Sequence, residues 1–214
     1  MSELIGANWI ILTPIIVLSV AALGVIIERT LFFLRIRPGS ESVFTQTISG
    51  IGNIPAVNLL NQLSEYSESP AVKLLDFALT TQIRKVPQIY KQRLEALRDR
   101  QLDKMEQNLP ILNGIGNVAT LMGLFGTVSG MIRAFSRMNE TGNSDPYILA
   151  GGISQALITT AAGLAVAIPA MLANHFFEAV VDRHAEQMNE VVNECLSISG
   201  VQYARKRESK TSPA

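Results

Sequence analysis

One stretch constrains the fold more than any other: residues 146–177 contain no Asp, Glu, Lys or Arg. This run exceeds the about 20 residues that an α-helix needs to cross the core of a bilayer. Small and polar residues recur along one face of the predicted helix: Thr160, Gly163, Ala167, Ala170 and Asn174. Small and polar residues are not expected on a helix face that contacts only lipid, so the pattern predicts contact with another helix or with a water-filled path. Tight helix packing alone would account for Gly163, Ala167 and Ala170.

Two more uncharged blocks, at residues 9–27 and 110–132, are long enough to span a membrane. A cleaved signal peptide is the competing interpretation of the first block. Residues 1–8 carry no Lys or Arg, and the apolar run is longer than the core of a usual signal peptide, so we expect a retained helix. The sequence therefore predicts an all-α membrane protein with three transmembrane helices, at residues 9–27, 108–132 and 147–177.

The segment between the first two spans is polar and of mixed charge. We expect residues 28–107 to form a cytoplasmic helical domain, with breaks at residues 38–40 and 49–55 and a helix that begins at Ser69 and Pro70. Another helix should lead into the second span with apolar residues along one side: Leu94, Leu97, Leu102, Met105 and Leu109. The long helices that contain the second and third spans should extend into the cytoplasm.

The remaining segments are a periplasmic N-terminus at 1–8, a periplasmic loop at 133–146, a cytoplasmic helix at 178–204 and a disordered tail at 205–214. The helix at 178–204 is amphipathic. Its apolar side carries Val181, Met188, Val192 and Cys195, and its polar side carries Asp182, Glu186 and Glu190.

Lys and Arg residues set the expected orientation. Most basic residues near the spans flank residues 28–107 and the C-terminal side, whereas Arg133 and Arg137 flank the opposite side. The positive-inside bias therefore predicts a multi-pass protein whose N-terminus lies outside and whose C-terminus is cytoplasmic.

The second span carries a ridge of small residues. Its members lie at helical spacing: Gly116, Ala119, Gly123, Gly126 and Gly130. Such a ridge permits close approach of another helix backbone. Residues 114–119 match the dinucleotide-binding pattern formally, but no strand precedes them and they lie within a bilayer-length run. Asn113, Thr120 and Thr127 form a polar stripe beside the ridge.

The chemistry of the spans excludes several functions. The second and third spans are polar in places but contain no carboxylate and no lysine, so the chain alone is a poor proton relay and a plausible lining for a carboxylate from a partner. Pro169 should cause a kink or bind a water. No catalytic motif occurs in a credible setting, and we expect neither a cofactor nor a metal. The equal counts of 18 basic and 18 acidic residues argue against nucleic acid as a partner.

Three runs are also familiar as motifs: GLFGTVSGMI at residues 123–132, GISQAL at 152–157 and TAAGLAVAIP at 160–169. They resemble the ExbB/TolQ/MotA family of proton-channel subunits, and the similarity is strongest over residues 105–177. Three spans rather than four favour the ExbB/TolQ branch.

The resemblance implies a homopentamer in the bacterial inner membrane, with the second and third helices around a central pore. That pore would hold two helices of an ExbD/TolR-like single-span protein, each with one aspartate, and a TonB/TolA-like protein is a further expected partner. The pore threonines of the family match Thr127 and Thr160. Several members carry glutamate where this chain has Gln155, so dependence on the partner's carboxylate is expected to be more complete here.

The pore-lining residues expected from spacing and resemblance together are Thr127, Thr160, Asn113, Thr120, Gln155 and Asn174, and those expected to serve helix packing are Gly116, Gly123, Gly126, Gly130 and Gly163. The main alternative is a non-conducting membrane scaffold that oligomerises through the glycine ridge. A solute transporter is a weaker alternative, because three spans without inverted repeats provide no alternating-access architecture.

Overall fold

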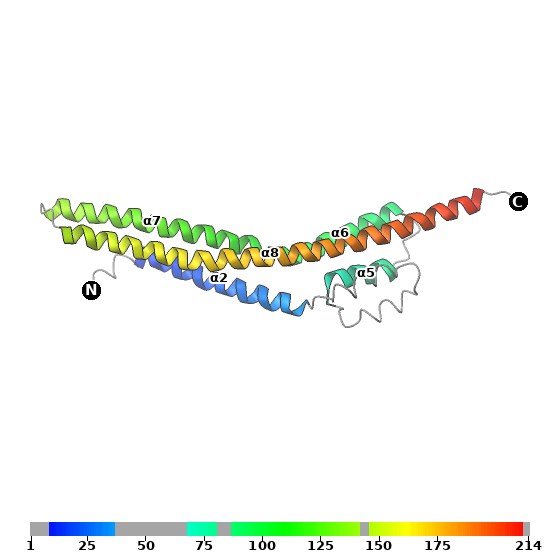
Figure 1. The fold of residues 1–214 in the computed structure, drawn as a ribbon, viewed down its shortest axis with the longest axis horizontal. Coiled ribbons are helices and arrows are strands. Elements are labelled where there is room, and N and C mark those ends of the chain that lie inside the picture. Colours follow the sequence, from blue (N-terminus) through cyan, green and yellow to red (C-terminus); the bar gives the residue numbers. More distant parts are fainter. Residues whose placement is uncertain (1–8, 37–67, 81–86, 142–145, 212–214) are drawn as a thin grey trace. The chain divides into compact units, whose positions relative to one another are not determined.

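The computed structural model describes residues 9–36, 68–80, 87–141 and 146–211 (Figure 1). All regular structure in these ranges is helical: α2 (Trp9–Arg35), α5 (Pro70–Thr80), α6 (Pro87–Glu106), α7 (Leu109–Thr141) and α8 (Pro146–Thr211). Within the described ranges, three segments are long and apolar enough to cross a membrane: Leu12–Arg35, Gln88–Glu140 and Leu149–Ser197. The predicted all-α membrane class with three spans is confirmed.

The chain divides into two compact units, and the first contains residues Met1–Thr30 and Asn108–Glu178. In this unit α7 runs antiparallel to the first part of α8, and the two helices lie side by side (Figure 1). Their outward faces expose large apolar side chains: Leu121, Leu124, Phe125, Ile158, Leu164, Ile168 and Leu172. Exposed apolar side chains in this number are usual where lipid or another protein covers them.

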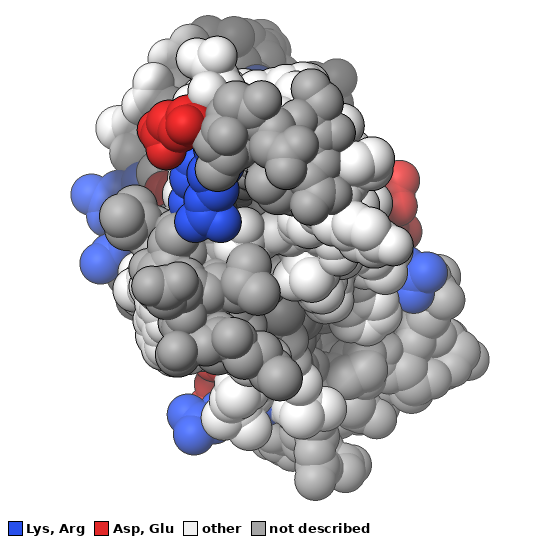
Figure 2. Space-filling view, turned by 90° about the vertical axis from the view of Figure 1, so that its left-hand side faces the viewer, with Lys and Arg blue, Asp and Glu red and all other residues white. Residues whose placement is uncertain are grey.

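Figure 2 shows one face of the molecule. Among the residues described there, Lys, Arg, Asp and Glu lie in a few separate places between uncharged residues.

The second unit contains residues Leu31–Gln107 and Ala179–Ala214. Helix α5 begins at Pro70, as predicted, and the Tyr90 hydroxyl of α6 donates a buried hydrogen bond to the Ala78 carbonyl at 3.0 Å. Arg98 of α6 donates to the Asn189 side chain of α8 at 3.0 Å. The predicted amphipathic pattern of α8 is confirmed, because Val181, Met188, Val192 and Cys195 are buried while Asp182, Glu186 and Glu190 are exposed.

Several helix boundaries differ from the predicted ones. Helix α7 continues through Thr141, so the first part of the predicted loop at 133–146 is helical. Helix α8 continues through Thr211, into the segment predicted as a disordered tail at 205–214. Both extensions consist mainly of residues with good or neutral helix propensity and contain no proline or glycine. The predicted breaks at 38–40 and 49–55 lie outside the described residues.

The predicted helix leading into the second span is interrupted. Helix α6 ends at Glu106 and α7 begins at Leu109, and Asn108 between them has a φ of 68°. Asparagine tolerates this left-handed conformation better than most residues. Pro110 also has no backbone N–H, and it disfavours the α-helical conformation in the residue before it. Both effects oppose one continuous helix through this segment.

Candidate functional site

The contact between α7 and α8 is built from glycines. A methyl group added at Gly163 would lie 2.6 Å from the Ala119 carbonyl oxygen and 2.9 Å from the Gly123 Cα. At Gly123 it would lie 3.2 Å from the Thr160 Cα, and at Gly130 it would lie 3.0 Å from the Ala156 Cβ. The helices therefore approach backbone to backbone, as small-residue interfaces in membranes permit. We call this contact the α7–α8 seam; it lies within one chain.

Thr159 and Thr160 occupy different places in the seam. Thr159 is 1% exposed, and a methyl group at Gly126 would lie 2.6 Å from its Cβ. Its hydroxyl donates to the Ala156 carbonyl of its own helix at 2.7 Å. The Thr160 hydroxyl is partly exposed and donates across the seam to the Gly123 carbonyl at 2.9 Å. Thr159 thus fills the contact, while Thr160 lies at its edge.

The threonine hydroxyls of the polar stripe of α7 donate hydrogen bonds to backbone carbonyls of the same helix. Thr120 donates to the Gly116 carbonyl at 3.0 Å, and Thr127 donates to the Leu124 carbonyl at 2.7 Å. The Asn117 amide donates to the Asn113 side chain at 3.2 Å. Each threonine oxygen can still accept a hydrogen bond, because a hydroxyl has two lone pairs.

Helix geometry places four of the predicted pore residues on one side of the seam. At about 100° per residue, Thr127 is rotated about 40° from Gly123, and Thr160 about 60° from Gly163, both in the same rotational sense. Because the helices are antiparallel, equal senses of rotation from the contact lines bring residues to the same side of the pair. The same reasoning adds two residues, Thr120 and Asn113. We call this side the threonine flank.

The other two predicted pore residues lie elsewhere. Gln155 is rotated about 80° from Gly163 in the opposite sense, toward the other side of the seam. Asn174 is 2% exposed and lies on the contact side of α8. Pro169 lies within the continuous helix α8, where it supplies no N–H to the backbone ladder.

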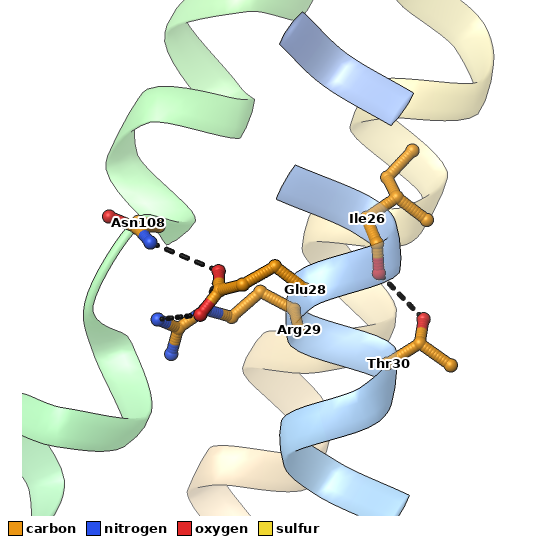
Figure 3. Close-up of polar contacts among 5 residues, drawn as sticks. All are labelled: Ile26, Glu28, Arg29, Thr30 and Asn108. Atoms are coloured by element: carbon orange, nitrogen blue, oxygen red, sulfur yellow. Dashed lines mark hydrogen bonds and ion pairs between the residues drawn. The ribbon is translucent and has the colours of Figure 1, made fainter. Parts of the chain in front are cut away.

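A polar cluster that the sequence analysis did not predict joins α2 to the start of α7 (Figure 3). The Glu28 carboxylate accepts hydrogen bonds from Arg29 Nε and Nη2, each at 2.9 Å, and from Asn108 Nδ2 at 3.0 Å. Arg29 is 2% exposed, so its charge needs these bonds. The charged pair that closes the first uncharged run, and an asparagine just before Leu109-Pro110, were the sequence signals for this cluster.

Replacing Asn108 tests how much its bond to Glu28 and its backbone conformation contribute to stability. Asn108→Ala loses a hydrogen bond to a carboxylate, worth about 1.5–3 kcal/mol, and puts a residue without local hydrogen bonding at a φ of 68°. Asn108→Gly loses the same bond but accepts positive φ, so it should be more stable than the alanine variant by roughly 1 kcal/mol. Thermal unfolding of the purified protein in detergent measures both. Equal stability of the two variants would show that the backbone conformation contributes nothing.

These features define a class: an all-α membrane protein whose second and third spans pack along a glycine seam with a hydroxyl-bearing flank. Residues 69–190 match the MotA/TolQ/ExbB proton channel family, and the chain belongs to that family.

Individual relatives agree with this assignment. An ExbB-like biopolymer transport protein of Synechocystis sp. is 29% identical over 183 residues, which are 84% of this chain and 70% of the relative. The Tol-Pal system protein TolQ of Haemophilus influenzae is 32% identical over 100 residues, 47% of this chain and 44% of the relative. The biopolymer transport protein ExbB of Xanthomonas campestris is 40% identical over 81 residues, 38% of this chain and 32% of the relative. The predicted resemblance to the ExbB/TolQ branch is confirmed.

Proposed function

We propose that this protein is an inner-membrane subunit of a complex that uses the proton motive force to drive biopolymer transport or to energise the outer membrane. In this proposal α7 and α8 line a central pore of a homopentamer, and the threonine flank faces the lumen. The observation that carries the proposal is the common flank of Thr127 and Thr160, in a chain of a proton channel family. The protein acts as a transport subunit and not as an enzyme.

The lumen needs an acid from a partner. Apart from His175 near one end, residues 110–132 and 146–177 supply hydroxyls and amides but no carboxylate, and groups that never change protonation cannot pass protons in steps. We therefore propose an ExbD/TolR-like single-span partner whose membrane aspartate lies near Thr127 and Thr160. A TonB/TolA-like protein would take up the mechanical output.

Proton flux into liposomes tests the proposal. The chain reconstituted alone should give little flux across an imposed gradient, and the chain reconstituted with its single-span partner should give a clear increase. A partner with its membrane aspartate changed to asparagine is the matched control and should return the flux to the level of the chain alone. Flux that is equal with and without the partner would contradict the proposal.

A non-conducting scaffold that oligomerises through the glycine ridge is the alternative. The ridge glycines Gly123, Gly126 and Gly130 pack against α8 of the same chain, so their surface is already covered. An oligomer must therefore use other faces of these helices, and this observation favours the conducting subunit over that form of scaffold.

Labelling of introduced cysteines in intact cells tests the proposed orientation. In a Cys195→Ser background, Glu140→Cys should react with a membrane-impermeant maleimide, because we propose that residues 133–146 are periplasmic. Glu65→Cys and Arg205→Cys should be protected until the cells are lysed. The reverse pattern would overturn both the orientation and the direction of coupling.

A further inference from the structure

Three polar residues of α8, Asn174, His175 and Glu178, form a cluster to which the proposed function assigns no joint role. The Asn174 amide Nδ2 donates to Glu178 Oε1 at 2.8 Å, and His175 Nδ1 lies 3.2 Å from Glu178 Oε2. Each oxygen of the Glu178 carboxylate therefore lies within hydrogen-bonding distance of a side-chain nitrogen. The Glu178 and His175 side chains are 48% and 72% exposed, so both groups can meet water.

Asn174, which donates to Glu178, is itself buried. It is 2% exposed, and its Oδ1 has no hydrogen-bond partner among the described residues. Turning the amide over would give Oδ1 a place against the Glu178 carboxylate, where two acceptors would repel each other. The Glu178 carboxylate thus fixes the orientation of the Asn174 amide. This orientation leaves the buried Oδ1 in need of a donor, such as a water molecule.

Glu178 and His175 lie on the side of the threonine flank, whereas Asn174 lies on the contact side of α8. Glu178 follows Thr160 by about five complete turns at 3.6 residues per turn, so both side chains leave α8 in the same direction, about 27 Å apart along the axis. His175 is rotated about 60° further in the same sense. A polar path along this flank would therefore end at a carboxylate and an imidazole, at the end of the unit where α7 begins.

We propose that His175 and Glu178, oriented by Asn174, form a proton-transfer site at this mouth of the flank. A proton arriving as hydronium binds the Glu178 carboxylate and leaves a water molecule. It then passes from the Glu178 carboxyl group to Nδ1 of the imidazole tautomer that carries its hydrogen on Nε2, and the imidazolium releases its Nε2 proton to a buffer base in bulk solution. This restores the carboxylate and leaves a neutral imidazole with its hydrogen on Nδ1, which returns to the first tautomer by proton exchange with water. The inference rests on the proposed function, since it requires protons to travel along the flank.

Dependence of the flux on buffer concentration distinguishes transfer from packing. When a protein group collects protons at a channel mouth, its loss makes the flux depend on mobile buffer, whereas a packing defect does not respond to buffer. In liposomes with the single-span partner, Glu178→Gln and His175→Gln should reduce flux several-fold in weakly buffered medium. Concentrated impermeant buffer should restore most of it.

Glu190→Gln is the matched control, because Glu190 is an exposed glutamate of the same helix outside the cluster. It should equal the unchanged protein in both media. Flux in Glu178→Gln that equals the unchanged protein in weak buffer, or that is low and not restored by buffer, would overturn the site. Absence of partner-dependent flux in the unchanged protein would overturn the proposed function itself, and with it this inference.

Discussion

Replacing Gly126 by leucine is expected to prevent the α7–α8 seam from closing and so to abolish the assembled complex. Even a methyl group at this position would lie 2.6 Å from the Thr159 Cβ, and Thr159 is 1% exposed with no room to retreat. Overpacking of well-packed contacts typically costs about 1–3 kcal/mol and sometimes more. Blue-native gels and thermal unfolding in detergent measure assembly and stability.

Gly114 is the matched control, because it lies on the same helix and a methyl group there meets nothing within 4 Å. Gly114→Ala should be neutral or slightly stabilising, whereas Gly126→Ala should destabilise. A compensating change sharpens the test, since Thr159→Gly removes the atoms that Gly126→Ala would strike. The double variant should therefore be more stable than the sum of the two single effects predicts. A Gly126→Leu variant that assembles and melts like the unchanged protein would contradict the placement of the seam.

The contrast between these glycines shows what periodicity can predict. Spacing identified the ridge face of α7 because small residues recur at helical intervals, whichever helix covers them. It did not predict that α8 of the same chain covers it, because a pattern on one helix carries no information about its neighbour. The separation of Thr159 from Thr160 also followed from the about 100° between adjacent residues.

Other features depended on contacts between distant segments. Glu28 and Asn108 are far apart in the sequence, and only the fold brings the carboxylate to the start of α7. The predicted loop at 133–146 was drawn too long because polar residues are common both in loops and on the wet faces of helices. For α7, helix propensity continued through Thr141 after the uncharged run had ended.

Asn174 shows a different limit. Thr160, Ala167 and Asn174 recur every seven residues, which placed Asn174 on the small, polar face of the third span, and it does lie on that buried face. Spacing did not show that Glu178 would hold its amide, since that bond requires both side chains to adopt particular rotamers. The helical face followed from the sequence, and the hydrogen bonds required the structure.

Replacing Thr160 by valine should leave assembly intact and sharply reduce energy transduction. The variant keeps the shape of the side chain and loses only the hydroxyl, whose bond to the Gly123 carbonyl is worth about 0.5–1.5 kcal/mol of stability. In the proposed lumen that hydroxyl does more, because its oxygen can accept from a protonated aspartic acid or hold a water beside the ionised form. A buried carboxylate without such solvation would be too costly to form.

Two further variants separate this role from packing. Thr160→Ser keeps the hydroxyl and should be milder. Thr159→Val makes the same exchange one residue earlier, where the hydroxyl bonds only to the Ala156 carbonyl of its own helix, so it should affect stability slightly and flux little. Partner-dependent proton flux at equal levels of assembled complex measures all three. If Thr160→Val assembles and conducts normally, the threonines serve packing alone, because the methyl group would then fill every role that the hydroxyl has.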